Sequence, residues 1–245
     1  MRVPGAAARG VVAAVSLLFG VQSARAEPDG GPKGVAARVA ALEATVSILN
    51  TRLAAIEANP IFALGQYVTV NPNTLNGLKG PHVIFTGANV HVRSGSGSTQ
   101  DVSGLTGLGN LLIGYNEPRP VPFAGRGGSH NLVVGPLHDY GSFGGFVAGS
   151  ENILVGPHSS VSGGVSNVAS GPESSVSGGN VNTASGGGSS VCGGQFNTAS
   201  GPNSSVSGGQ LNTASGAYSS VSGGLQGEAP GEFDWTAGDA LFSDQ

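Results

Sequence analysis

The residues most able to do chemistry are His138, Asp139 and Tyr140, which are consecutive and follow His130 closely. A histidine, a carboxylate and a phenol are groups that general acid–base catalysis uses. The chain nevertheless has no GxSxG elbow, no GK phosphate loop, no HExxH helix and no glycine–aspartate calcium nonapeptide. We therefore interpret the cluster as a loop with satisfied polar groups, and we expect no enzyme, no cofactor and no metal.

The composition excludes an ordinary mixed globular fold. The 245 residues include 44 glycines, and only 10% are charged and 6% aromatic, which is typical of repetitive structures. The formal net charge is −4, and every Lys and Arg lies at or before Arg126. We expect no nucleic acid among the partners, because the second half of the chain carries only acidic charges. Cys192 is the lone cysteine and has no partner for a disulfide within the chain.

Residues 1–26 have the pattern of a bacterial signal peptide. Arg2 and Arg9 flank the start of the apolar run GVVAAVSLLFGV, and Ala24 and Ala26 are the small residues of a cleavage site. The run is about a dozen residues long, whereas a spanning helix needs about 20. We expect a mature chain that has no membrane span and is exported to the extracellular space or cell surface, with residues 27–34 as a flexible linker. An uncleaved anchor is the alternative.

Residues 35–58 have the heptad pattern of a parallel coiled coil. On this register Arg38 and Arg52 occupy g positions, while Glu43 and Glu57 occupy the e positions that would face them across a parallel pair. The pattern does not decide between two strands and more than two, and a single amphipathic helix packed on its own domain is the alternative. The apolar seam consists of Val35, Val39, Leu42, Val46, Leu49, Leu53 and Ile56.

A recurring asparagine marks a repeat over residues 110–226. Its spacing is 21, 21 and then four times 15 residues, at Asn110, Asn131, Asn152, Asn167, Asn182, Asn197 and Asn212. The phrases NxASG and SSVSGG alternate within each 15-residue unit, and each predicts a short strand that ends in glycine. We interpret residues 115–130 and 136–150 as loops inserted into the two longer units.

Stacking of these units predicts an all-β fold, a parallel β-solenoid with 15-residue coils. Strands would bond to their copies about 4.8 Å above and below. One inward ladder would consist of Val161, Val176, Val191, Val206 and Val221, and it would face Ala169, Ala184, Ala199 and Ala214. We expect the asparagines to lie in turns that require φ near or above zero.

The segments on either side of the repeat predict irregular structure. Residues 61–109 should form irregular first coils, with strands at 66–70, 82–87 and 88–95. Residues 227–245 break the repeat and should form a C-terminal cap over the open strand edge. The candidates for capping are Phe233, Trp235, Leu241 and Phe242; an aromatic ligand-binding patch is the alternative.

The repeat phrases, together with GNLLIGYNE (109–117), SHNLVVG (129–135) and ENILVG (151–156), resemble the head repeats of trimeric autotransporter adhesins. The resemblance covers residues 105–226. It implies a YadA-like, left-handed parallel β-roll that assembles as a homotrimer. In that family a coiled-coil stalk and a β-barrel anchor follow the head, whereas here the predicted coil precedes it. We therefore expect a head-bearing protein that is secreted or peripherally attached to the bacterial cell.

Two classes of function follow from these patterns. The first is an adhesive or structural head module that binds a surface, a glycan or a protein through its exposed loops. The second is an ice- or crystal-binding solenoid that uses Thr183, Thr198 and Thr213 as a flat ladder beside a row of serines. A carbohydrate-active solenoid enzyme is disfavoured because Glu173 is the one charged residue between 152 and 226.

Overall fold

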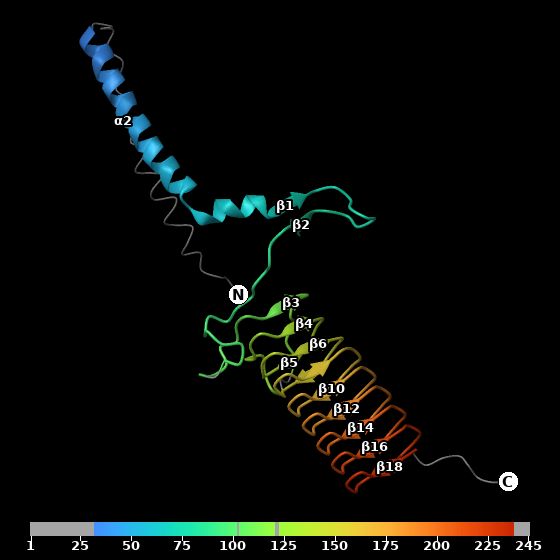
Figure 1. The fold of residues 1–245 in the computed structure, drawn as a ribbon. Coiled ribbons are helices and arrows are strands. Elements are labelled where there is room, and N and C mark those ends of the chain that lie inside the picture. Colours follow the sequence, from blue (N-terminus) through green and yellow to red (C-terminus); the bar gives the residue numbers. More distant parts are fainter. Residues whose placement is uncertain (1–31, 102, 121–122, 238–245) are drawn as a thin grey trace, which may run out of the picture. The chain divides into compact units, whose positions relative to one another are not determined.

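The structure is a computed structural model that describes residues 32–101, 103–120 and 123–237. The predicted signal peptide, most of the predicted linker, and Leu241 and Phe242 of the predicted cap lie outside the described residues. The chain divides into two compact units between Asn89 and Val90, and Figure 1 shows the elements of each. Each unit is described by itself.

The first unit contains a long helix, a short 3₁₀ helix and a hairpin. Helix α2 spans Pro32–Glu57 and η1 spans Pro60–Gln66, while β1 (Val68–Asn71) pairs antiparallel with β2 (His82–Phe85). Helix α2 begins three residues before the predicted coiled coil, at a proline, which the first turn tolerates because its missing N–H has no partner there. The Asn59 side chain caps η1 by accepting a hydrogen bond of 3.0 Å from the Ile61 N–H.

The prediction of irregular first coils over residues 61–109 differs from the structure. Strands are present within 66–71 and 82–87, but they form a two-stranded antiparallel hairpin in the first unit. The segment 88–95 contains no strand. Alternation of apolar and polar residues identified the strands but not their partners, because the same alternation suits a hairpin and a solenoid coil.

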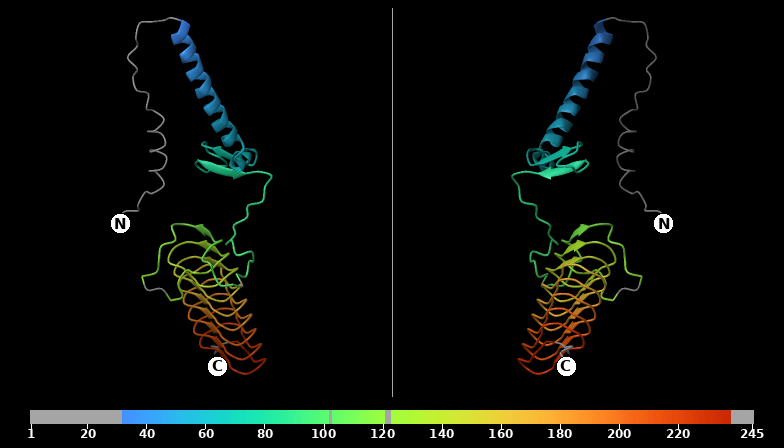
Figure 2. Two further views of the ribbon diagram at one scale, coloured as in Figure 1. Left: turned by 90° about the vertical axis from the view of Figure 1, so that its left-hand side faces the viewer. Right: turned by 90° about the vertical axis from the view of Figure 1, so that its right-hand side faces the viewer.

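The second unit is a parallel β-solenoid whose coils stack along one axis, as the two views in Figure 2 show. The nine-stranded sheet consists of β3 (Leu111–Ile113), β4 (Leu132–Val134), β6 (Phe146–Ala148), β8 (Ser160–Val161), β10 (Ser175–Val176), β12 (Ser190–Val191), β14 (Ser205–Val206), β16 (Ser220–Val221) and β18 (Trp235–Thr236). The seven-stranded sheet consists of β5 (Asp139–Tyr140), β7 (Ile153–Leu154), β9 (Val168–Ala169), β11 (Thr183–Ala184), β13 (Thr198–Ala199), β15 (Thr213–Ala214) and β17 (Glu228–Ala229). The predicted parallel β-solenoid preceded by a helix is confirmed.

The core of the solenoid is a valine ladder that faces an alanine ladder. The predicted valines are at most 1% exposed, and Ala169, Ala184, Ala199 and Ala214 are fully buried. In-register pairs such as Val191 with Val206 and Ala184 with Ala199 stack like side chains on each other. Small residues suffice because most of the backbone polar groups bond to the coils above and below.

The second 21-residue spacing of the asparagines has a cause that the sequence pattern concealed. Asn131 precedes β4 in the nine-stranded sheet, whereas Asn152 precedes β7 in the seven-stranded sheet. The chain between them passes through β5 and β6, which are regular members of the two sheets. Residues 136–150 are therefore not an inserted loop, and the 21 residues make one and a half coils.

The predicted break of the repeat after residue 226 is wrong for the described residues. Strands β17 and β18 extend both sheets by one more rung, with Thr213 beside Glu228 and Ser220 beside Trp235. Trp235 lies on the outside of its strand, is 69% exposed, and donates from Nε1 to the Ser222 hydroxyl at 2.8 Å. Phe233 stacks on Tyr218 with ring centroids 5.3 Å apart, so these aromatic residues follow the side of the solenoid.

Candidate functional site

The five predicted ladder asparagines form a continuous chain of side-chain hydrogen bonds inside the solenoid. All five are fully buried. The Oδ1 of Asn182 accepts from the Asn197 N–H at 3.0 Å, and its Nδ2 donates to the carbonyls of Gly178 and Gly194 at 3.0 and 2.9 Å. The same pattern joins Asn152 to Asn167, Asn167 to Asn182, Asn197 to Asn212, and Asn212 to Gly227. Each amide therefore links neighbouring coils.

The expectation that these asparagines adopt φ near or above zero is wrong. The residue before each asparagine has positive φ instead, as in Val181 (55°), Phe196 (55°) and Leu211 (59°). The left-handed turn at this preceding residue directs its own side chain outward, and the asparagine that follows is buried. Sequence reasoning assigned the asparagine to the turn because Asn tolerates φ > 0 best; the buried ladder explains why an amide is required at the next position.

His138 begins the same ladder in place of an asparagine. Its Nδ1 accepts from the Asn152 N–H at 3.2 Å, and its Nε2 lies 3.1 Å from the Val134 carbonyl, four residues earlier. The later asparagines contact the same two backbone groups of their coils. Burial of the ring holds the pKa of His138 below its ordinary value of 6.5. A neutral imidazole, with one acceptor and one donor, satisfies both contacts.

The other members of the acid–base cluster are also committed to the fold. Asp139 and Tyr140 are buried in β5. The Asp139 carboxylate accepts from the N–H groups of Phe123 and Ala124 at 2.6 and 3.2 Å, and the Tyr140 hydroxyl accepts from the Asn116 side chain at 2.9 Å. These contacts fix Asn116, Phe123 and Ala124 to the solenoid. Asp139 and Tyr140 therefore lie on a strand and not on the predicted loop, and His138 directly precedes that strand.

The exposed apolar side chains in the described parts of the chain include two stripes. On α2 the seven seam residues, which we call the helix stripe, are 46–64% exposed. On the solenoid, Val181, Phe196 and Leu211 stack in adjacent coils and are 39–43% exposed; we call them the corner stripe. By length and composition alone, Lys33–Glu57 would be long and apolar enough to cross a membrane, which differs from the expectation for the mature chain.

A cavity of about 580 Å³ lies at the beginning of the second unit. Its walls consist of residues 91–95, 97–99 and His130. The His130 ring joins the two sides, because Nε2 accepts from the Ser94 N–H at 3.1 Å and Nδ1 lies 2.9 Å from the Thr99 carbonyl. We call this space the His130 cavity. Sequence reasoning missed it, since its walls come from segments 36 residues apart.

A buried carboxylate supports the wall of the His130 cavity. Asp101 is 3% exposed and accepts hydrogen bonds from the hydroxyls of Ser94, Ser96 and Thr106. Hydrogen bonding, first from the neighbouring Ser129 hydroxyl and then from Ser96, holds the pKa of Asp101 well below its ordinary value of 3.8. The ionised carboxylate therefore gathers the SGSGS turn into one conformation.

Small polar side chains form columns on the outer faces of both sheets. Thr183, Thr198 and Thr213 are paired in register and half-buried. Cys192 lies one residue after β12, where the corresponding residues of other coils are serines, and is exposed. Within the described residues, no group of three or more His, Cys, Asp or Glu side chains could hold a metal ion.

Comparison with known proteins adds no identification: no family model matches the chain, and no curated protein matches it at a significant level.

Proposed function

We propose that this chain is an exported, non-enzymatic head module that assembles as a homotrimer of the adhesin-head type and binds a surface, a glycan or a protein. The observation that carries the proposal is the combination of a narrow solenoid with an exposed helix stripe. The solenoid displays loops on a rigid body, and the helix stripe is not covered by the 3₁₀ helix or the hairpin of its own unit. The proposal includes a left-handed winding of the solenoid coils, as in the β-roll of adhesin heads.

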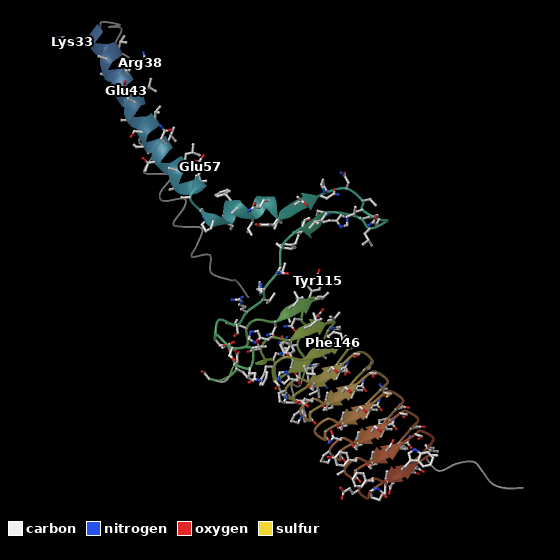
Figure 3. The ribbon with its side chains drawn as sticks, viewed as in Figure 1. Lys33, Arg38, Glu43, Glu57, Tyr115 and Phe146 are labelled. Atoms are coloured by element: carbon white, nitrogen blue, oxygen red, sulfur yellow. The ribbon has the colours of Figure 1, made fainter. Side chains whose placement is uncertain are left out.

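The charges on α2 support a helix that associates with copies of itself in water. Figure 3 shows Lys33, Arg38, Glu43 and Glu57 distributed along the helix. A charged side chain near the centre of a bilayer costs about 2.5 kcal/mol or more, whereas in a parallel coiled coil Arg38 and Glu43 face each other across the seam. Parallel pairing would therefore cover the helix stripe and use its flanking charges.

The corner stripe supports contact between solenoids. A valine, a phenylalanine and a leucine in successive coils make a continuous apolar line beside an outward column whose end residues, Val165 and Leu225, are also exposed and apolar. Three parallel chains held in register by their helices would bring three such lines to the same level. Each coil buries only one Val and one Ala in its own core. Burying the corner stripe between chains would add about 25 cal/mol per Å² of apolar area to this small stabilisation.

The decisive test is the solution mass of residues 27–245 by light scattering. We expect three chains for the wild type, and a smaller assembly for the variant Leu42→Asp, Leu49→Asp, Ile56→Asp. The matched control places the same three charges on the outer side of α2, as Ala37→Asp, Ala44→Asp, Thr51→Asp, and should keep the wild-type mass. A monomeric wild type with full β-structure by circular dichroism would refute the trimer and the adhesin analogy together.

An ice- or crystal-binding solenoid is the second candidate function. It is supported by the in-register, half-exposed threonines at 183, 198 and 213. The column continues as Val168 on one side and Glu228 on the other, so the regular array is short. Thermal hysteresis of the purified chain tests this candidate, and replacing Thr198 with Glu should abolish any hysteresis that is found.

A further inference from the structure

The His130 cavity is an open depression, lined mostly by exposed residues, that has the volume of a binding site for a small ligand. Its volume of about 580 Å³ is within the range of roughly 300–1,000 Å³ found for ligand sites. The wall does not depend on the ligand for its shape, because Asp101 holds Ser94 and Ser96 by their hydroxyls. On the other side, a Cβ at Gly109 would lie 2.7 Å from the His130 ring and 2.7 Å from the Ser94 nitrogen, so the two walls are pressed together over this glycine.

The cavity also contains the one arginine of the second unit's described residues that has no firm internal partner. Arg119 donates to the Glu151 carbonyl and Arg126 donates to the Asn116 carbonyl, both at 2.6 Å. Arg93 makes only a contact of 3.5 Å with His91, at the limit of a hydrogen bond. No carboxylate is among the residues that line the cavity. The guanidinium of Arg93 is therefore available to an anion.

The remaining lining indicates the kind of anion. Except for Val92, it consists of small polar residues, glycines and two histidines, so it offers hydrogen bonds and no apolar subsite for a peptide side chain. A guanidinium binds a carboxylate through two parallel hydrogen bonds. Hydroxyl-bearing walls suit a ligand that is itself covered with hydroxyls.

We propose that the His130 cavity binds a carboxylate-bearing sugar residue of an acidic saccharide. Arg93 holds the carboxylate, the Ser98 and Thr99 segment hydrogen-bonds to the sugar hydroxyls, and the imidazole rings of His91 and His130 pack beside the sugar ring. This inference rests on the proposed function, of which it specifies the ligand. It places the ligand at the first turns of the solenoid unit and not on the repeated coils.

The test is calorimetric titration of residues 27–245 with trigalacturonate and with its methyl ester, which has the same skeleton but no charge. We expect binding of the acid in the millimolar range or tighter, and at least about tenfold weaker binding of the ester. Arg93→Gln should weaken binding of the acid at least about tenfold. Lys79→Gln, which removes one positive charge from the first unit, is the control and should change the affinity less than about twofold.

Three outcomes would overturn the inference: no binding of the acid at about 10 mM, equal binding of acid and ester, or equal losses in Arg93→Gln and Lys79→Gln. Tighter binding of a hexaglutamate peptide than of trigalacturonate would overturn the assignment to a saccharide. Light scattering and circular dichroism on the same samples separate this inference from the proposed assembly. A trimer that binds no acid refutes only the cavity, whereas a monomer that binds it selectively refutes only the trimer.

Discussion

The asparagine ladder makes the sharpest prediction about stability, which concerns the substitution Asn182→Ala. The Asn182 amide is the hydrogen-bond partner of the buried Asn197 N–H and of the Gly178 carbonyl, and it makes a further bond to Gly194. The Gly194 carbonyl keeps its bond from the Asn180 N–H. The Asn197 N–H is buried, whereas the Gly178 carbonyl belongs to a half-buried residue. The substitution therefore leaves one buried polar group without a partner, and the free energy of unfolding should fall by about 1–3 kcal/mol.

The matched control is Asn180→Ala, two residues earlier in the same coil. Asn180 is only half-buried, and its side chain has a single contact of 3.4 Å with the Gln195 amide. Its replacement should cost less than about 0.5 kcal/mol. Urea unfolding of both variants, followed by far-ultraviolet circular dichroism at one protein concentration, measures the difference. Equal and small losses for the two variants would show that the ladder is not what holds the coils together.

Three further predictions use the same unfolding assay. Gly194→Ala should destabilise the solenoid by at least about 1–3 kcal/mol, because φ is 83° and the new Cβ would overlap the Gly209 carbonyl, whereas Gly193→Ala meets nothing within 4 Å and should be nearly neutral. Val191→Ala should cost about 1.5–3 kcal/mol because it removes two fully buried carbons from the valine ladder; a loss below that of the half-exposed Ser190→Ala would contradict this assignment. His138→Asn should keep both ladder contacts and change the pH dependence. Since the folded-state pKa of His138 is depressed, the unfolded chain takes up the proton first, and wild-type stability should decrease as pH falls below about 6.5. The variant should lack this decrease, and identical pH profiles would be the contrary result.

The regular coils could be predicted from the sequence because each phrase occurs several times with one spacing. Repetition of SSVSGG determines the strand, its register and its inward valine together, since stacked copies must present the same side to the core. The helix over residues 35–57 could likewise be predicted from the seven-residue period of Val39, Val46 and Leu53, which lie on one side of α2. In both cases a single period determined which side chains share a face.

The features that could not be predicted either lack such a period or keep the repeat's asparagine at a different place in the coil. The half-coil step between Asn131 and Asn152 keeps the asparagine but moves it to the other sheet, and spacing alone cannot distinguish this from an insertion. The role of His138 could not be predicted, because its imidazole resembles the asparagine amides only in the two backbone contacts that it makes in the folded structure. The His130 cavity depends on contacts between segments distant in the chain, such as Ser94 with His130, and these have no signature in a single sequence.

The ladder also has a direction, and this determines how such a molecule can change length. Every Oδ1 bonds to the coil that follows, and the last bond goes to Gly227, which has no side chain with which to continue. Each joint involves only adjacent coils, so duplication of one 15-residue unit would add a rung without altering any existing contact. The distance between the cavity end and the final coil would grow by one strand spacing, about 4.8 Å. The length of the solenoid can therefore change in steps of one coil, so that related genes could encode proteins with the same two ends separated by different distances.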